Sequence, residues 1–109
     1  MTVSEVAEKL SLRPLVLPCP DRTADGAYTG DLLSWVMGNA REGNVWVTIM
    51  TNRNILAVAT LIDLCCVVVC EDSDIGEDVL ALAREKNVNL LQTDKTAYAV
   101  CKELALLGI

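Results

Sequence analysis

The chain has no histidine and no phenylalanine, and aromatic residues make up only 4% of its 109 residues. Without histidine, no Ser-His or Cys-His pair can form, which excludes the most common arrangements for nucleophilic catalysis. A G-x-x-x-x-G-K-[ST] phosphate loop and a G-x-G-x-x-G turn after a strand are also missing. Because aromatic residues are so few, we expect a core built from Leu, Val, Ile and Ala.

Long apolar runs are absent too. The longest, Leu64–Cys70, is far shorter than the roughly 20 residues of a membrane-spanning helix. Residues 1–13 are amphipathic and charged, so we expect no signal peptide and a cytoplasmic location. The five cysteines are then expected as reduced thiols. A net charge of −6 without a basic face argues against nucleic acid or an acidic membrane as a partner.

Four short apolar runs alternate with segments of helical periodicity, which is typical of strand–helix units in a parallel sheet. We therefore predict one domain over residues 1–109, with a three-layer α/β/α fold, about four strands and about five helices. Thr2 and Glu5 have the spacing of a capping box for a helix near residues 3–10. A second helix is expected to begin near Thr29–Asp31, with Thr29 as its N-cap. The four runs are Leu15–Leu17, Val45–Ile49, Cys65–Val69 and Asn89–Leu91.

In such a sheet the loops that follow the strands gather along one edge, where ligands usually bind. The segments expected at this carboxyl edge are 18–30, 50–54, 70–76 and 93–96. Each leads into a helix N-terminus, which carries a partial positive charge and free amide donors. We therefore expect Arg22 and Arg53 to lie near each other and to bind a small anion, such as a nucleotide or a phosphorylated metabolite.

Several segments together resemble the signature of the DRTGG domain. The resemblance implies an α/β domain that regulates or interacts and is not itself catalytic. Such domains resemble the N-terminal domain of HPr kinase/phosphorylase and occur between the CBS domains of some inorganic pyrophosphatases. In place of the family's paired glycines, this chain has Gly26 followed by Ala27, which would affect any ligand needing close approach to both. The matching segments are Asp21-Arg22-Thr23, Gly26, Tyr28, Gly30–Met37, Val45–Ile49, Asn54, Ala57–Ala59, Leu90–Asp94 and Thr96.

The resulting prediction is a non-catalytic regulatory or interaction module with no cofactor and no metal. Its predicted ligand-binding residues are Asp21, Arg22, Thr23, Gly26, Thr51, Asn52, Arg53, Asn54, Thr93 and Thr96. Helix capping is an alternative explanation for Thr29, Asn54, Asp74, and Asp94 or Thr93. The acidic run Glu71–Asp74 would repel phosphate and would favour a cation or a basic partner surface.

Two other function classes stay open. One is an enzyme acting on a phosphorylated compound, with Asp21, Asp31 or Asp72 as the base. The other is a metal or redox accessory protein that uses the cysteines. No C-x-x-C pair exists, and Cys65 and Cys66, as neighbours on a strand, are expected on opposite faces.

The second helix carries Trp35 among Leu33, Val36 and Met37, so it is apolar nearly all round. A helix of this kind must be covered on both sides. We therefore expect a homodimer through this helix or through the tail Leu104–Ile109, and a protein partner is a further possibility. Trp46, on a predicted strand, is expected to pack against a helix.

Overall fold

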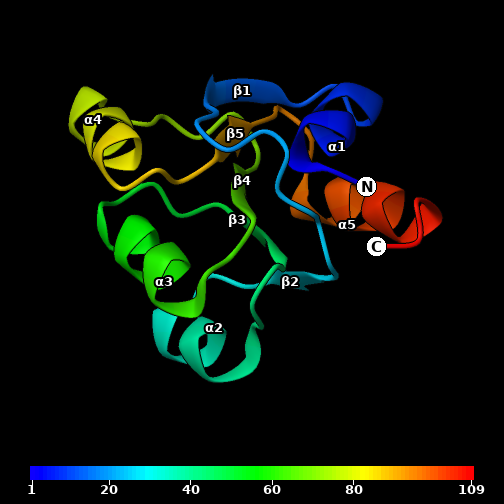
Figure 1. The fold of residues 1–109 in the computed structure, drawn as a ribbon, viewed down its shortest axis with the longest axis horizontal. Coiled ribbons are helices and arrows are strands. Elements are labelled where there is room, and N and C mark those ends of the chain that lie inside the picture. Colours follow the sequence, from blue (N-terminus) through cyan, green and yellow to red (C-terminus); the bar gives the residue numbers. More distant parts are fainter.

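The computed structural model is built on one five-stranded sheet in the order β1-β5-β4-β3-β2 (Figure 1). Strands β2 to β5 are parallel, whereas β1 pairs with β5 in the antiparallel direction. The strands are β1 (Arg13–Val16), β2 (Ala27–Thr29), β3 (Val45–Thr48), β4 (Cys66–Val69) and β5 (Leu90–Gln92).

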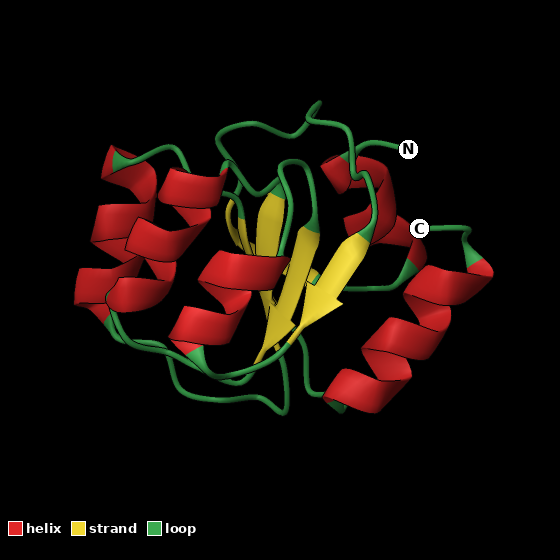
Figure 2. Cartoon of the chain, turned by 90° about the horizontal axis from the view of Figure 1, so that it is seen from below, coloured by secondary structure: helices red, strands yellow, loops and turns green.

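Helices cover both faces of the sheet, with α1 and α5 on one face and α2, α3 and α4 on the other (Figure 2). The predicted three-layer α/β/α fold with five helices is therefore confirmed. No helix in the structure has the length and apolar character needed to cross a membrane. The helices are α1 (Val3–Lys9), α2 (Leu33–Asn39), α3 (Asn54–Ile62), α4 (Glu77–Glu85) and α5 (Ala97–Leu106).

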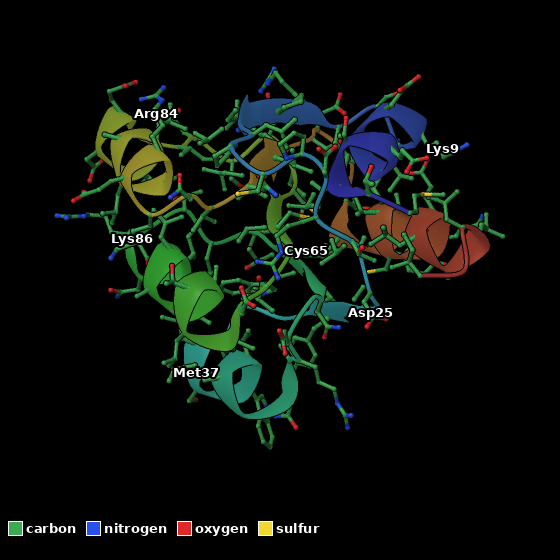
Figure 3. The ribbon with its side chains drawn as sticks, viewed as in Figure 1. Lys9, Asp25, Met37, Cys65, Arg84 and Lys86 are labelled. Carbon is green, nitrogen blue, oxygen red and sulfur yellow. The ribbon has the colours of Figure 1, made fainter.

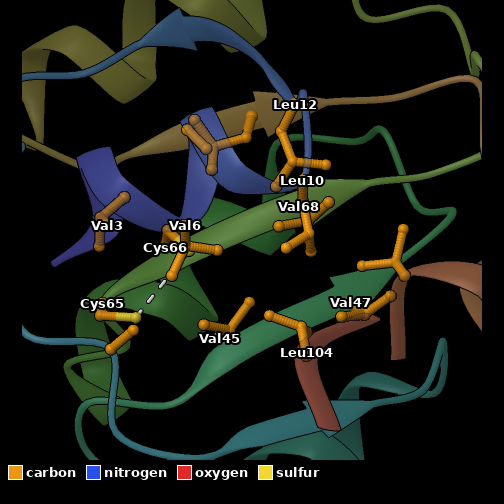
Figure 4. Packing of buried hydrophobic residues seen from close by; sticks show 14 of the residues in the cluster. Val3, Val6, Leu10, Leu12, Val45, Val47, Cys65, Cys66, Val68 and Leu104 are labelled. Atoms are coloured by element: carbon orange, nitrogen blue, oxygen red, sulfur yellow. Dashed lines mark hydrogen bonds between the residues drawn. The ribbon is translucent and has the colours of Figure 1, made fainter. Parts of the chain in front are cut away.

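The core consists of two clusters of 15 buried residues, one on each face of the sheet (Figure 4 shows the cluster beneath α1 and α5). Every residue of β3 and β4 is buried, as is typical of parallel strands covered on both sides. The core is aliphatic as expected, with Trp46 as its one large aromatic residue. Trp46 packs with residues of α2, α3 and α4, and its Nε1 donates to the Gly30 carbonyl at 2.9 Å.

Strand β2 was not predicted. Thr29, expected as a helix N-cap, is instead the last residue of this strand, and α2 begins only at Leu33. The strand exists because Ala27, Tyr28 and Thr29 pair with β3 in parallel register. A run of three residues is too short to show an alternating pattern, so only this long-range pairing reveals it.

The direction of β1 is the second difference from prediction. Because β1 runs opposite to the other strands, the segment that follows it starts at the amino edge of the sheet rather than at the carboxyl edge. It then crosses that end of the sheet and enters β2 from the same edge (Figure 1). A parallel β1 would need a long crossover to return to the start of β2, usually through a helix, and residues 17–26 contain none.

Helix capping also differs from expectation. The capping box is confirmed, because Thr2 Oγ1 accepts from the Glu5 amide and Glu5 accepts from the Thr2 amide. Thr96 caps α5 by accepting from the Ala99 amide. Thr96 was predicted as a ligand-binding residue and not as a cap. The residues suggested as caps of the later helices hold no N-cap position, since α2, α3, α4 and α5 have Leu32, Arg53, Gly76 and Thr96 there.

Candidate functional site

The structure divides the predicted ligand-binding residues between two opposite edges of the sheet. Arg53 is the N-cap of α3, while Arg22 bonds to Asp63, the C-cap of the same helix. At 1.5 Å per residue these two caps are about 15 Å apart. The prediction that Arg22 and Arg53 share one pocket is therefore wrong. Asp21, Arg22, Thr23 and Gly26 lie on the amino-edge segment, and Thr51, Asn52, Arg53, Asn54, Thr93 and Thr96 follow β3 or β5 at the carboxyl edge.

At the amino edge, Arg22 closes the end of α3. Its Nη1 donates to Asp63 Oδ1 at 2.7 Å and its Nη2 donates to the Asp63 carbonyl at 2.9 Å. The hydrogen bond to Oδ1, together with the positive charge of Arg22, lowers the pKa of the Asp63 carboxyl below its usual value. A guanidinium also offsets the partial negative charge at a helix C-terminus. Arg22 thus has a structural partner on each terminal nitrogen.

The neighbours of Arg22 are held by the backbone of this edge. Thr23 forms an antiparallel bridge with Thr2. Gly26 has φ +74°, and a Cβ on it would lie 2.9 Å from the Asn44 side-chain nitrogen. That nitrogen donates to the Asp25 carbonyl at 2.6 Å. Close packing of the turn before β2 therefore accounts for Gly26.

Asn89 was not predicted as a functional or structural residue. It holds residues 17–26, the segment that crosses the amino edge, against the sheet. Its side chain is buried, accepts from the Cys19 amide at 2.9 Å and donates to the Cys19 and Cys65 carbonyls at 2.7 and 2.9 Å. A small hollow of about 80 Å³ lies beside it, lined in part by Arg22, Cys65 and Lys86. Cys65 and Lys86 are marked in Figure 3. At the amino edge, hydrogen bonds thus join the segment after β1 to the rest of the fold.

At the carboxyl edge, the start of α3 presents Arg53 in no ion pair and no side-chain hydrogen bond. The Asn54 amide donates to Asn52 Oδ1 at 2.9 Å. The next two amides, of Ile55 and Leu56, donate to backbone carbonyls. The first amides of the helix are therefore occupied, and the group left for an anion is the Arg53 guanidinium.

The three carboxylates suggested as an enzymatic base do not meet at one place. Asp31 joins the ends of β2 and β3, because its Oδ1 accepts from Thr48 Oγ1 at 2.7 Å and from the Ile49 amide at 3.0 Å. Asp72 pairs at 3.5 Å with Arg13 of β1, the outer strand opposite to β2. Asp21 lies on the amino-edge segment. No two of them share a substrate-sized site.

The largest cavity, of about 280 Å³, opens at the carboxyl edge where β1 and β5 meet. Of the predicted ligand-binding residues only Thr93 lines it, together with Asp72, which was suggested as an enzymatic base, and Asp94, which was suggested as a helix cap. Arg13 was missed because its place depends on the antiparallel direction of β1, which brings it opposite Gln92. The six lining residues, none of them hydrophobic, are Ser11, Arg13, Asp72, Gln92, Thr93 and Asp94.

Residues 31–107 match the family model of the DRTGG domain. The chain belongs to the DRTGG domain family. Among solved structures it is similar to the CBS and DRTGG domains of the regulatory region of Clostridium perfringens pyrophosphatase, complexed with the activator diadenosine tetraphosphate. The TM-score is 0.76 at 12% identity, over 93% of this chain and 44% of that chain, so the likeness shows the fold. Comparison with curated protein sequences finds no match.

The match to the DRTGG family begins at Asp31, so the resembling segment from Asp21 to Gly30 lies outside it. Ala27, which stands where the family pattern has its second glycine, is an ordinary strand residue of β2. Its φ is not in the left-handed region, unlike that of Gly26. Alanine at this position therefore needs no strained backbone in this DRTGG domain.

The cysteines of the DRTGG domain are five free thiols. Cys65 and Cys66, expected on opposite faces, both belong to the cluster under α1, with their sulfurs 3.9 Å apart (Figure 4). The hydrogen bond with Cys65, together with burial, raises the pKa of Cys66. Burial, with a smaller effect from Cys101, raises the pKa of Cys70 to about 11. No group of three or more Cys, Asp or Glu side chains is placed to hold a metal ion.

Proposed function

We propose that this DRTGG domain is a non-catalytic regulatory or interaction module that acts as one unit over residues 1–109. The observation that carries the proposal is its fold, which it shares with the regulatory region of a pyrophosphatase at a TM-score of 0.76. Because that region was complexed with a nucleotide activator, a nucleotide or phosphorylated metabolite is the ligand class we propose here. The free thiols are compatible with a cytoplasmic location.

For the ligand we propose the carboxyl edge, with Arg53 as the cation and Thr51, Asn52 and Asn54 as hydrogen-bonding neighbours. Thr93 and Thr96 follow β5 on the same edge and extend this surface. Support comes from the rule that open parallel sheets bind ligands beyond the carboxyl ends of their strands. The proposed site leaves out the four predicted residues that lie at the amino edge, which are Asp21, Arg22, Thr23 and Gly26.

A thermal-shift screen with nucleotides and sugar phosphates tests the ligand proposal. We expect at least one compound to raise the melting temperature of the parent in a saturable way. That shift should disappear in Arg53→Ala and persist in Arg84→Ala, which removes the same charge from the exposed face of α4. A screen without any shift, or equal loss in both variants, would contradict the proposal.

We also propose that α2 joins two copies of the chain. Trp35 is 64% exposed and Leu32 is 60% exposed, which is unusual for two large apolar side chains so close in sequence. Met37 lies on the same helix and points away from the sheet (Figure 3). Next to α2, the outer edge of β2 has no partner strand. An edge of this kind is suited to pairing with another chain.

Sedimentation at micromolar concentrations tests the dimer. The parent is expected to sediment as a dimer, and Trp35→Glu as a monomer. Tyr98→Glu is a matched control, because Tyr98 is an aromatic residue on α5, on the other face of the sheet, and is even more exposed than Trp35. A parent that is monomeric throughout the concentration range would rule out this interface.

A further inference from the structure

The cavity between β1 and β5 is a polar hollow on the carboxyl edge. It forms because the sheet is mixed: β1 begins where β5 ends, so Arg13 stands opposite Gln92 in the register. The loop after β4 adds Asp72 and the loop after β5 adds Asp94. Its volume of about 280 Å³ is just below the range of drug-sized sites, so the occupant must be small.

The charges in this cavity are one guanidinium and two carboxylates. Arg13 contacts Asp72 at 3.5 Å and donates to Gln92 Oε1, which leaves other N–H donors of its fork unused. Asp94 takes part in no ion pair. The site therefore carries one excess negative charge and one free carboxylate, and it lacks an apolar wall on which a hydrophobic ligand could pack.

The cavity floor is buried and hydrogen-bonded. Gln92 and Thr93 are only 7% and 6% exposed. Gln92 is held at both ends of its amide, since its Nε2 donates to the Ser73 carbonyl at 2.7 Å and its Oε1 accepts from Arg13. Thr93 Oγ1 accepts from the Lys95 amide at 3.2 Å, so its hydroxyl proton is left for another acceptor.

The backbone that carries Asp72 is also held by hydrogen bonds. Glu71 and Asp72 both have left-handed backbones, with φ of 60° and 52°. Their amides donate to the carbonyls of Lys95 and Thr93, each at 2.9 Å. These bonds join the two loops and hold the backbone of Asp72, whose side chain is 67% exposed and contacts Arg13.

We propose that this cavity binds a small diamino carboxylic acid, an amino acid with a second ammonium group. The ligand carboxylate pairs with the free N–H donors of Arg13, and its two ammonium groups pair with Asp94 and Asp72. Such a ligand carries a net charge of one positive unit, which complements the excess negative charge of the site. A phosphate would meet two carboxylates here, so this site differs in charge from the proposed anion site at Arg53, and the two share only Thr93.

Amide chemical shifts of the ¹⁵N-labelled full chain, recorded during titration with L-lysine, test the proposal. We expect saturable shifts at the amides of Asp72, Gln92 and Thr93 with L-lysine up to about 10 mM, ten times a millimolar dissociation constant. L-Leucine, which has the same carboxylate and α-ammonium group with an apolar side chain, should bind at least about tenfold more weakly. Cadaverine, which has both ammonium groups and no carboxylate, should also bind more weakly.

Three variants complete the test. Asp94→Asn and Arg13→Gln should each weaken L-lysine binding by about tenfold or more. Asp74→Asn makes the same charge change outside the cavity, on the loop after β4, and should leave the affinity within about twofold. Arg53→Ala should also leave it unchanged, which separates this site from the anion site. Absence of shifts, equal binding of L-leucine, or equal effects of Asp94→Asn and Asp74→Asn would overturn the proposal.

Discussion

At the scale of single residues, Arg22 shows how a residue type can mislead. An arginine in a long loop suggests a free cation for a ligand, whereas its two terminal nitrogens bond to the Asp63 side chain and carbonyl. Nothing local to the sequence joins these residues, because they are 41 positions apart. The pairing depends on the path of the segment after β1, which is a property of the whole sheet.

This pairing predicts a pH-dependent contribution to stability. The folded state holds the pKa of Asp63 below its ordinary value of 3.8, so it binds fewer protons there than the unfolded chain. The contribution is therefore present above the unfolded pKa and is lost as the pH falls through the folded pKa. Because both side chains are partly exposed, we expect at most about 1 kcal/mol.

Urea unfolding of the parent and Asp63→Asn measures the effect. The variant should be less stable at pH 7, and the difference should shrink at a pH below the lowered pKa. Asp25→Asn serves as the control, because Asp25 is an exposed carboxyl of the same edge without an ion pair. A difference that stays constant with pH would show that the Asp63 charge is not responsible.

At the scale of elements, the helices, the buried strands and the presence of a strand at β1 could be predicted from the sequence, while β2 and the direction of β1 could not. Strands β3 and β4 are continuous apolar runs because both of their faces are buried. Strand β2 has three residues and owes its existence to β3. The direction of β1 is likewise decided by its pairing with β5. This direction also determines that Arg13 lies at the cavity.

Gly26 provides a test of how tightly β2 is joined to its turn. Replacement by alanine forces a side chain into a left-handed backbone and against Asn44, so we expect Gly26→Ala to destabilise the fold by about 1–3 kcal/mol. Gly38→Ala is the matched control, because Gly38 lies in α2 with nothing near its Cβ position. That change should stabilise the helix by about 0.5–1 kcal/mol. Chemical denaturation measures both, and equal effects would contradict this explanation of Gly26.

At the scale of the whole molecule, the two ends of the sheet differ in how far their side chains are engaged in hydrogen bonds. The amino edge is crossed by a segment that bonds in turn to Asn89, Asp63 and Asn44. The carboxyl edge carries the unpaired Arg53 and the polar cavity beside Arg13. General rules for parallel sheets favour the carboxyl edge as the place for a ligand site, but a prediction that treats β1 as parallel assigns Asp21, Arg22, Thr23 and Gly26 to that edge, whereas they lie at the amino edge.

The central claim is that ligands of this DRTGG domain bind at the carboxyl edge and that the amino edge is structural. The most direct measurement is a map of amide chemical shifts while a nucleotide that raises the melting temperature is added to the labelled chain. Changes concentrated at residues 51–54, with none at residues 21–26, are the predicted result. Changes concentrated at residues 21–26 would contradict the claim.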